Sequence, residues 1–141
     1  MPTSSMVSYP KAARRHFADA TLLAAQGRNP NAGQLYGFAA ECGIKALLPF
    51  DPVRDCAAGS VGKTHIQKIV NQFAQVQTAY QSRCCERCLA MIPSINHFHD
   101  WHTDQRYWDE CHLPPSLTAW RDAATEVCLM LDQAKQDGRI A

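Results

Sequence analysis

Long apolar runs are absent from this chain, and so is a leader of the secretory type. A helix that crosses a membrane needs about 20 consecutive apolar residues, and no stretch of the sequence approaches that length. The N-terminus, MPTSSMVSYPKAARRH, has no apolar core of the kind that secretory signals carry. We therefore expect a soluble protein of the cytoplasm, with no membrane partner.

An excess of charge is absent as well. Lysine and arginine together number 14 and aspartate and glutamate 13, which gives a net charge of +1 over 141 residues. Such a balance creates no long-range field that would draw the protein onto a polyanion, so any contact with nucleic acid has to be local. The length suits one domain, which can bury a core without disulfides or metal.

The period-two alternation of β-strands is also missing, whereas apolar residues recur at helical spacing. Segments with this spacing cover residues 9–27, 31–48, 64–76, 79–92 and 116–138. The fourth segment either continues the third or is kinked from it. The pattern predicts one all-α domain over residues 9–137, an up-and-down bundle of four to five helices, with tails at residues 1–8 and 138–141.

Glycine and proline mark where the expected helices begin and end. Gly27, with Pro30 just beyond it, ends the first helix, and Asn31 is placed to cap the second. Because Pro49 follows the second helix and the connection is short, these two helices should form an antiparallel hairpin. The last helix is expected to begin after a cap at Ser116.

Residues 31–48, NAGQLYGFAAECGIKALL, are almost wholly apolar apart from one acid and one base. A helix of this composition is packed on nearly every side, and its alanines and glycines let neighbouring backbones approach closely. Glu41 and Lys45 are four residues apart in the favourable order, so their side chains meet on one face. This helix is expected at the centre of the fold.

Residues 93–114 differ from the rest because no helical period holds there. The segment nevertheless contains four aromatic side chains and four of the six histidines. A long loop of this kind inside a compact domain is often functional. We expect a loop that carries binding or catalytic residues.

Three parts of the sequence together resemble the HEPN family. They are the helix of residues 31–48, an upstream helix with Ala13, His16, Phe17, Asp19, Ala20 and Leu23, and the downstream residues Asp100, Trp101, Asp104, Arg106 and Tyr107. HEPN domains are small all-helical modules, commonly dimeric, of prokaryotic toxin–antitoxin and nucleotidyltransferase-associated systems, and many are metal-independent ribonucleases. The resemblance implies a HEPN-like bundle, a nucleotidyltransferase or antitoxin partner, and RNA or a nucleotide as ligand.

Arg106 and His112 are the candidate catalytic residues. Five residues separate them, a spacing that the resemblance associates with RNA cleavage. A histidine can move the proton of a 2′-hydroxyl or of the leaving oxygen, and an arginine stabilises charge on the phosphate, so that no metal is needed. Tyr107 stands where the family usually has a polar residue, and the Leu-Pro-Pro run after the histidine opposes a continuous helix. The alternative is an arginine that ties the loop down through Asp100 or Asp104.

The pair of Glu41 and Lys45 is open to two interpretations. If it is buried, the two charges must neutralise each other, and this structural role is the one we favour. The alternative is a cleft that holds a nucleotide or an RNA phosphate. The candidate substrate-binding residues of that cleft are Glu41, Lys45, Tyr36, Trp101 and Tyr107.

Two further motifs suggest ligands less strongly. The seven cysteines are expected to be reduced thiols in the cytoplasm. Cys84, Cys85 and Cys88, with the histidines that follow, superficially supply zinc ligands, but no second close pair of ligands exists and helix packing is favoured, so no metal is assigned. Residues 59–64, GSVGKT, imitate the end of a P-loop, but Ala57 replaces the opening glycine and no strand precedes it.

A small basic cluster lies on the first expected helix and consists of Lys11, Arg14, Arg15 and His16. A solvated helix face accounts for it. If RNA binds, these side chains could position its backbone through phosphate contacts, which give affinity without sequence preference.

The function we expect is that of a nucleotide- or RNA-binding helical module that acts with a partner such as a nucleotidyltransferase or antitoxin and needs no cofactor. Self-association as a homodimer is expected because the chain has more small and aromatic residues than one core requires. A metal-independent endoribonuclease is the alternative function. A structural adaptor without catalysis is a further one.

Overall fold

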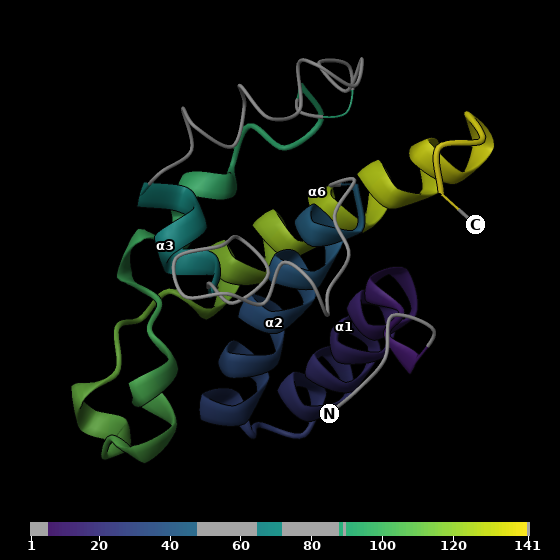
Figure 1. Cartoon of the computed structure of the whole chain (residues 1–141). Helices are drawn as coiled ribbons and strands as arrows, with labels where there is room; N and C mark the ends of the chain where they lie inside the picture. Colours follow the sequence, from purple (N-terminus) through teal and green to yellow (C-terminus); the bar gives the residue numbers. More distant parts are fainter. Residues whose placement is uncertain (1–5, 48–64, 72–87, 89, 141) are drawn as a thin grey trace.

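The computed structural model describes residues 6–47, 65–71, 88 and 90–140. Within these ranges the chain is helical and contains no β-strand, which confirms the predicted all-α class. Its α-helices are α1 (Tyr9–Ala25), α2 (Asn29–Leu47), α3 (Ile66–Asn71) and α6 (Leu117–Gln136), and its 3₁₀ helices are η3 (Ile95–Asp100), η4 (Thr103–Tyr107) and η5 (Glu110–His112) (Figure 1). A HEPN-like arrangement of these helices stays a prediction.

The helices α1 and α2 form the predicted antiparallel hairpin, joined by residues 26–28 and lying side by side (Figure 1). Ser8 caps α1, because its side chain accepts a hydrogen bond from the backbone N–H of Lys11 at 3.4 Å. The chain reverses at Gly27, whose φ of +75° lies in the left-handed region that glycine adopts without a steric penalty.

The predicted start of α2 is wrong by two residues. The helix begins at Asn29, so Asn31 lies inside its first turn and does not cap it. Pro30 explains the difference, because its fixed φ suits the first turn of a helix and its missing N–H is not needed there. The proline that marked the end of α1 in the sequence therefore belongs to the start of α2.

The helix α2 packs against α1 and against α6, and it is buried along most of its length, as its composition predicts. Its glycines mark close approaches, because an added Cβ at Gly37 would overlap the indole of Trp101 and one at Gly43 would overlap Val127. The small residues of α2 are thus used inside one chain. The homodimer stays a prediction. Within the described ranges, the large apolar side chains that are exposed are Met6, Leu22, Tyr107, Trp108 and Leu129.

The segment that the sequence left without a period folds into η3, η4 and η5, and hydrogen bonds tie it to α2. Trp101 Nε1 donates to the backbone oxygen of Gly33 at 3.0 Å. Gln34 Nε2 donates to the backbone oxygen of His102 at 3.0 Å. These bonds fix the segment through individual side chains rather than through a repeating apolar face, which is why a period search does not detect its order.

The carboxylate of Asp100 joins η3 to the start of α6. Its Oδ1 accepts a hydrogen bond from Trp120 Nε1 at 2.9 Å, and its Oδ2 accepts one from the hydroxyl of Ser116. Ser116 precedes α6 as predicted, but its side chain makes no capping hydrogen bond. The hydroxyl serves the contact between two elements instead.

Several predictions concern residues outside the described ranges. They are the P-loop-like residues 59–64, Cys84, Cys85 and the helical residues predicted over 72–76 and 79–87. Residues 90–92, where the fourth helical segment was expected to end, are not helical. Cys88 is described and is buried in the core. Within the described ranges, no three metal-ligating side chains gather closely enough to hold an ion, and no helix combines the length and apolar character needed to cross a membrane.

Candidate nucleic-acid interface

Two of the predicted substrate-binding residues, Tyr36 and Trp101, lie in the core. Both are 0% exposed. The hydroxyl of Tyr36 is 3.3 Å from Oγ1 of Thr21, and the indole N–H of Trp101 is used by the backbone of α2. A ligand could reach either ring only if the core opened, so their placement corrects the expectation of a cleft lined by these rings.

Arg106, Tyr107 and His112 are exposed, and they lie on two different 3₁₀ helices, the first two on η4 and the last on η5. The guanidinium of Arg106 lies over the ring of Tyr107, 4.8 Å from its centroid, and not against Asp100 or Asp104 as the structural alternative expected. His112 lies on η5 and lines a shallow concavity with Trp108 and Asp109. The catalytic roles of the pair stay predictions.

The pair of Glu41 and Lys45 is formed as the helical spacing predicts, and it is buried. Lys45 Nζ lies 2.9 Å from Glu41 Oε2, and the two side chains are 4% and 10% exposed. The ring of Tyr9, at the start of α1, covers the ammonium group at 5.9 Å. This geometry agrees with the favoured structural role, because a buried charge requires a compensating partner.

The other carboxylate oxygen of Glu41 holds a histidine that the sequence did not single out. Oε1 of Glu41 is 3.0 Å from Nδ1 of His65, which lies just before α3. An ionised carboxylate can only accept a hydrogen bond, so the contact places a hydrogen on Nδ1 of a neutral His65 and leaves Nε2 as the nitrogen that can exchange a proton. The side chain of His65 is 49% exposed, so the ring is partly accessible to a ligand.

Three rings form a continuous strip beside the buried pair. The ring of Phe38 is 5.9 Å from that of His16 on α1 and 6.0 Å from that of His65. Phe38 also packs edge-on against the buried indole of Trp101 at 5.6 Å, which fixes it from behind. We call His16, Phe38 and His65 the histidine strip. Flat, partly exposed rings of this kind can stack against the bases of a nucleotide.

The surroundings of the histidine strip on α1 are basic. Residues 9–28 contain four basic side chains and one acid. Lys11 and Arg15 are exposed and one helical turn apart, so they share one face of α1. The charge of Arg15 acts on the neighbouring ring of His16. Arg14 is instead paired with Asp132 at 2.7 Å. By contrast, residues 99–112 contain one arginine and four acids.

Burial lowers the pKa of His16 below its ordinary value of 6.5, and the positive charge of Arg15 lowers it further, against the opposing effects of Asp19 and Glu41. The folded protein therefore binds this proton less readily than the unfolded chain does. The stability that neutral His16 contributes is complete above pH 6.5 and is lost as the pH falls below it.

We expect His16→Gln to reduce the loss of stability on acidification. Urea unfolding one pH unit above and one below 6.5 should give a smaller difference in unfolding free energy for the variant than for the parent protein. His99→Gln, at an exposed position, is the control and should leave the difference unchanged. Equal pH dependence in all three proteins would contradict the assignment.

The sequence alone does not single out His65 and Phe38, because neither belongs to a spaced motif. His65 is separated from Glu41 by 24 positions, and only the folded chain brings them together. His16 appeared in the sequence as part of a basic cluster, and that cluster is the signal that could have pointed to this face. The interface therefore combines a predicted contact, the Glu41–Lys45 pair, with rings whose proximity can be seen only in the folded chain.

No family model, no curated protein and no solved structure matches this chain.

Proposed function

We propose that the protein is a nucleotide- or RNA-binding helical module of the HEPN-like kind, and that single-stranded RNA lies along the histidine strip. The observation that carries the proposal is the continuous set of three rings, one of which lies on α1, the helix whose exposed face carries Lys11 and Arg15. Aromatic rings beside cations are the combination with which proteins hold single strands, because bases stack on the rings while phosphates meet the cations.

The distribution of charge favours an RNA contact that is confined to one part of the protein surface. The net charge of +1 gives no long-range attraction, whereas residues 9–28 have three more basic than acidic side chains. A contact of this size neutralises a few phosphates, so the affinity should be modest and should fall as salt is added. Stacking on a ring contributes about 1–3 kcal/mol per base in proteins that bind single strands.

The buried pair of Glu41 and Lys45 fixes the orientation of one ring of the histidine strip. Glu41 holds His65 at 3.0 Å and Lys45 at 2.9 Å, so the imidazole has one orientation before any ligand arrives. A preorganised ring loses less conformational freedom on binding than a free one does. On this proposal the resemblance supplies the biological setting, in which a HEPN-like homodimer serves a nucleotidyltransferase or antitoxin partner.

We expect removal of the cations to weaken RNA binding without altering the fold. The double variant Lys11→Ala/Arg15→Ala should bind a short single-stranded RNA more weakly at low salt. The slope of log affinity against log salt should become shallower by about 1 for each lost phosphate contact. Fluorescence anisotropy of a labelled RNA measures both quantities, and a gel of the same RNA with EDTA present reports whether binding is accompanied by cleavage.

The matched control is Lys135→Ala, which removes an exposed cation from the last turn of α6. It should leave affinity and salt slope unchanged. His65→Asn tests the rings, and it should lower affinity at low and at raised salt, since stacking does not depend on ionic strength in the way a phosphate contact does. If the parent protein binds no RNA at low salt, or if the control weakens binding as much as the double variant, the proposal fails.

A further inference from the structure

The ring of Trp101 connects the histidine strip with an open concavity of about 360 Å³. The centroid of this ring is 6.3 Å from that of His65, and the ring also lines the concavity. Gln67, which follows His65 by two residues on α3, is a further lining residue. The exposed side chains that line it are His99, His102, Asp104 and Trp108. We call it the Trp108 concavity, and a strand that lies along the histidine strip can extend into it.

Hydrogen bonds to the backbone determine what the two histidines of the concavity offer a ligand. Nδ1 of His99 is 3.0 Å from the backbone oxygen of Asn96, which can only accept, so Nδ1 carries the hydrogen of the neutral ring and Nε2 is an acceptor. Nδ1 of His102 accepts from the backbone N–H of Asp104 at 3.0 Å, so the hydrogen of this neutral ring lies on Nε2. His102 is therefore a donor and His99 an acceptor.

The carboxylate of Asp104 lies beside the donor ring. Its Oδ2 is 3.5 Å from Nδ1 of His102, and the two side chains are 69% and 47% exposed. An ionised carboxylate only accepts hydrogen bonds, through two adjacent oxygens. The concavity thus presents a pair of acceptors next to one donor. Because the charge of Asp104 repels a phosphate, the part of an RNA that suits the concavity is a base and not the backbone.

We propose that the Trp108 concavity binds a guanine base of the single-stranded RNA that lies along the histidine strip, an inference that rests on the proposed function. The Watson–Crick edge of guanine has two adjacent N–H donors, at N1 and N2, beside the acceptor O6. The two donors match the oxygens of Asp104, and O6 matches the N–H of His102. The face of the base stacks on the indole of Trp108, which is 46% exposed.

The other bases match these groups less well. Uracil has a single donor between two oxygens, so one of its oxygens would face the carboxylate of Asp104. Adenine and cytosine each have an amino donor, but the ring nitrogen beside it is an acceptor and would face the same carboxylate. Two acceptors set against each other form no hydrogen bond, and both lose the water that they held. The concavity should therefore select guanine rather than bind every base equally.

The test compares short uridine-rich RNAs that differ at one central position, which holds guanine, hypoxanthine, adenine or uracil. Hypoxanthine has the shape of guanine and lacks only the amino group at N2. Fluorescence anisotropy at low salt should show the guanine RNA bound about tenfold more tightly than the hypoxanthine RNA, the range for one hydrogen bond to a charged group. The adenine and uracil RNAs should bind no more tightly than the hypoxanthine RNA.

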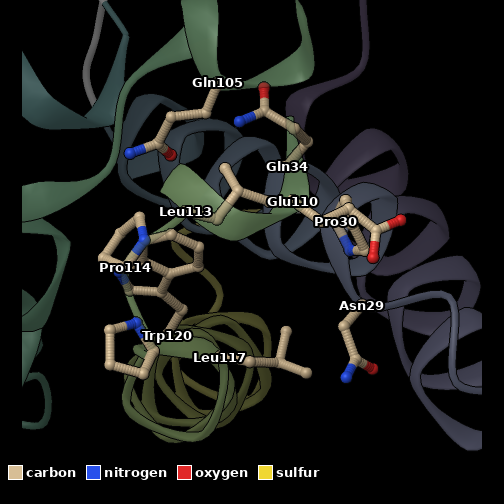
Figure 2. Close-up of a pocket in the computed structure, with 10 residues that line it drawn as sticks. Asn29, Pro30, Gln34, Gln105, Glu110, Leu113, Pro114, Leu117 and Trp120 are labelled. Carbon is tan, nitrogen blue, oxygen red and sulfur yellow. The ribbon is translucent and has the colours of Figure 1, made fainter. Parts of the chain in front are cut away.

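Two acid variants separate base recognition from the general effect of charge. Asp104→Asn should abolish the preference for guanine, whereas the loss of a negative charge alone would strengthen the binding of all four RNAs equally. Glu110→Gln is the matched control, because Glu110 belongs to the same acid-rich residues 99–112 but lines a different pocket, between α2 and α6 (Figure 2). It should keep the preference. Trp108→Ala should weaken the guanine RNA, because the base loses its stacking surface.

The outcomes distinguish this inference from the proposed function. If the four RNAs bind the parent protein equally well, the guanine site is wrong and RNA binding at the histidine strip is unaffected. If none of the four binds at low salt, both proposals are wrong. A preference for guanine that persists in Asp104→Asn, or that Glu110→Gln removes to the same extent, would overturn the assignment of Asp104 as the recognising carboxylate.

Discussion

Replacing Glu41 by glutamine is expected to lower the free energy of unfolding by about 3–5 kcal/mol, the range for removing one partner of a buried ion pair. Glutamine preserves the shape of the side chain and removes the charge. The ammonium of Lys45 would then remain 4% exposed, with no carboxylate at the present distance of 2.9 Å. Urea unfolding followed by the helical circular dichroism signal measures the change.

An exposed ion pair in the same molecule supplies the control. Arg14 and Asp132 are 2.7 Å apart, closer than the buried pair, but their side chains are 42% and 53% exposed. Asp132→Asn should therefore change the unfolding free energy by at most about 1 kcal/mol. If Glu41→Gln lowers the unfolding free energy by no more than Asp132→Asn does, burial does not determine how much the Glu41–Lys45 pair contributes to stability.

A double variant distinguishes the penalty of an orphaned charge from the value of the pair itself. Glu41→Leu combined with Lys45→Met replaces both charges by apolar side chains of similar size. Because both desolvation costs vanish together, this protein should be more stable than either single variant, and its stability should approach that of the parent. A double variant as unstable as the sum of the two singles would show that the two charges act independently.

The helices that could be predicted from the sequence are those with a repeating apolar face. The hairpin of α1 and α2 and the last helix α6 follow from apolar periodicity and from Gly27 at the turn. Local signals place their ends only within a few residues, as the start of α2 shows. There the proline at position 30 opened a helix instead of closing one, and both roles are compatible with its fixed φ.

The segment with η3, η4 and η5 could not be predicted, because its order comes from single long-range hydrogen bonds. Trp101 reaches Gly33 and Trp120 reaches Asp100, and each contact joins residues that are far apart in the sequence or in different elements. A long-range hydrogen bond of this kind produces no local sequence pattern, so it can be recognised only when the backbone positions are known. The aromatic content of the segment was visible, but whether each ring was buried or exposed was not.

The same limit applies to the candidate nucleic-acid interface. The spacing of Glu41 and Lys45 is a local property and was sufficient to predict their contact. The position of His65 beside Glu41 depends instead on how separate elements meet. Polar residues at a fixed spacing in the sequence indicate contacts within one helix, but they do not indicate contacts between separate elements.

Replacing Gly37 by alanine is expected to destabilise the fold by about 1–3 kcal/mol or more, the range for forcing extra atoms into a packed core. The added methyl would overlap the indole of Trp101, which is 0% exposed and bound to the backbone of α2 by its N–H. The ring cannot move without breaking that bond. Alanine has the higher helix propensity, by about 1 kcal/mol, so any net loss reports the overlap alone.

A graded series makes this result decisive. At Gly33 the nearest atom to an added Cβ is Cζ3 of Trp120, at 2.8 Å, so Gly33→Ala should cost less than Gly37→Ala. Gly43→Ala should be costly in the parent protein, because the methyl overlaps Val127, and should cost much less in a Val127→Ala background that provides the space. Urea unfolding of these variants gives the comparison. Equal costs at Gly33 and Gly37, or no relief from Val127→Ala, would mean that α2 is not packed as closely against its neighbours as the structure requires.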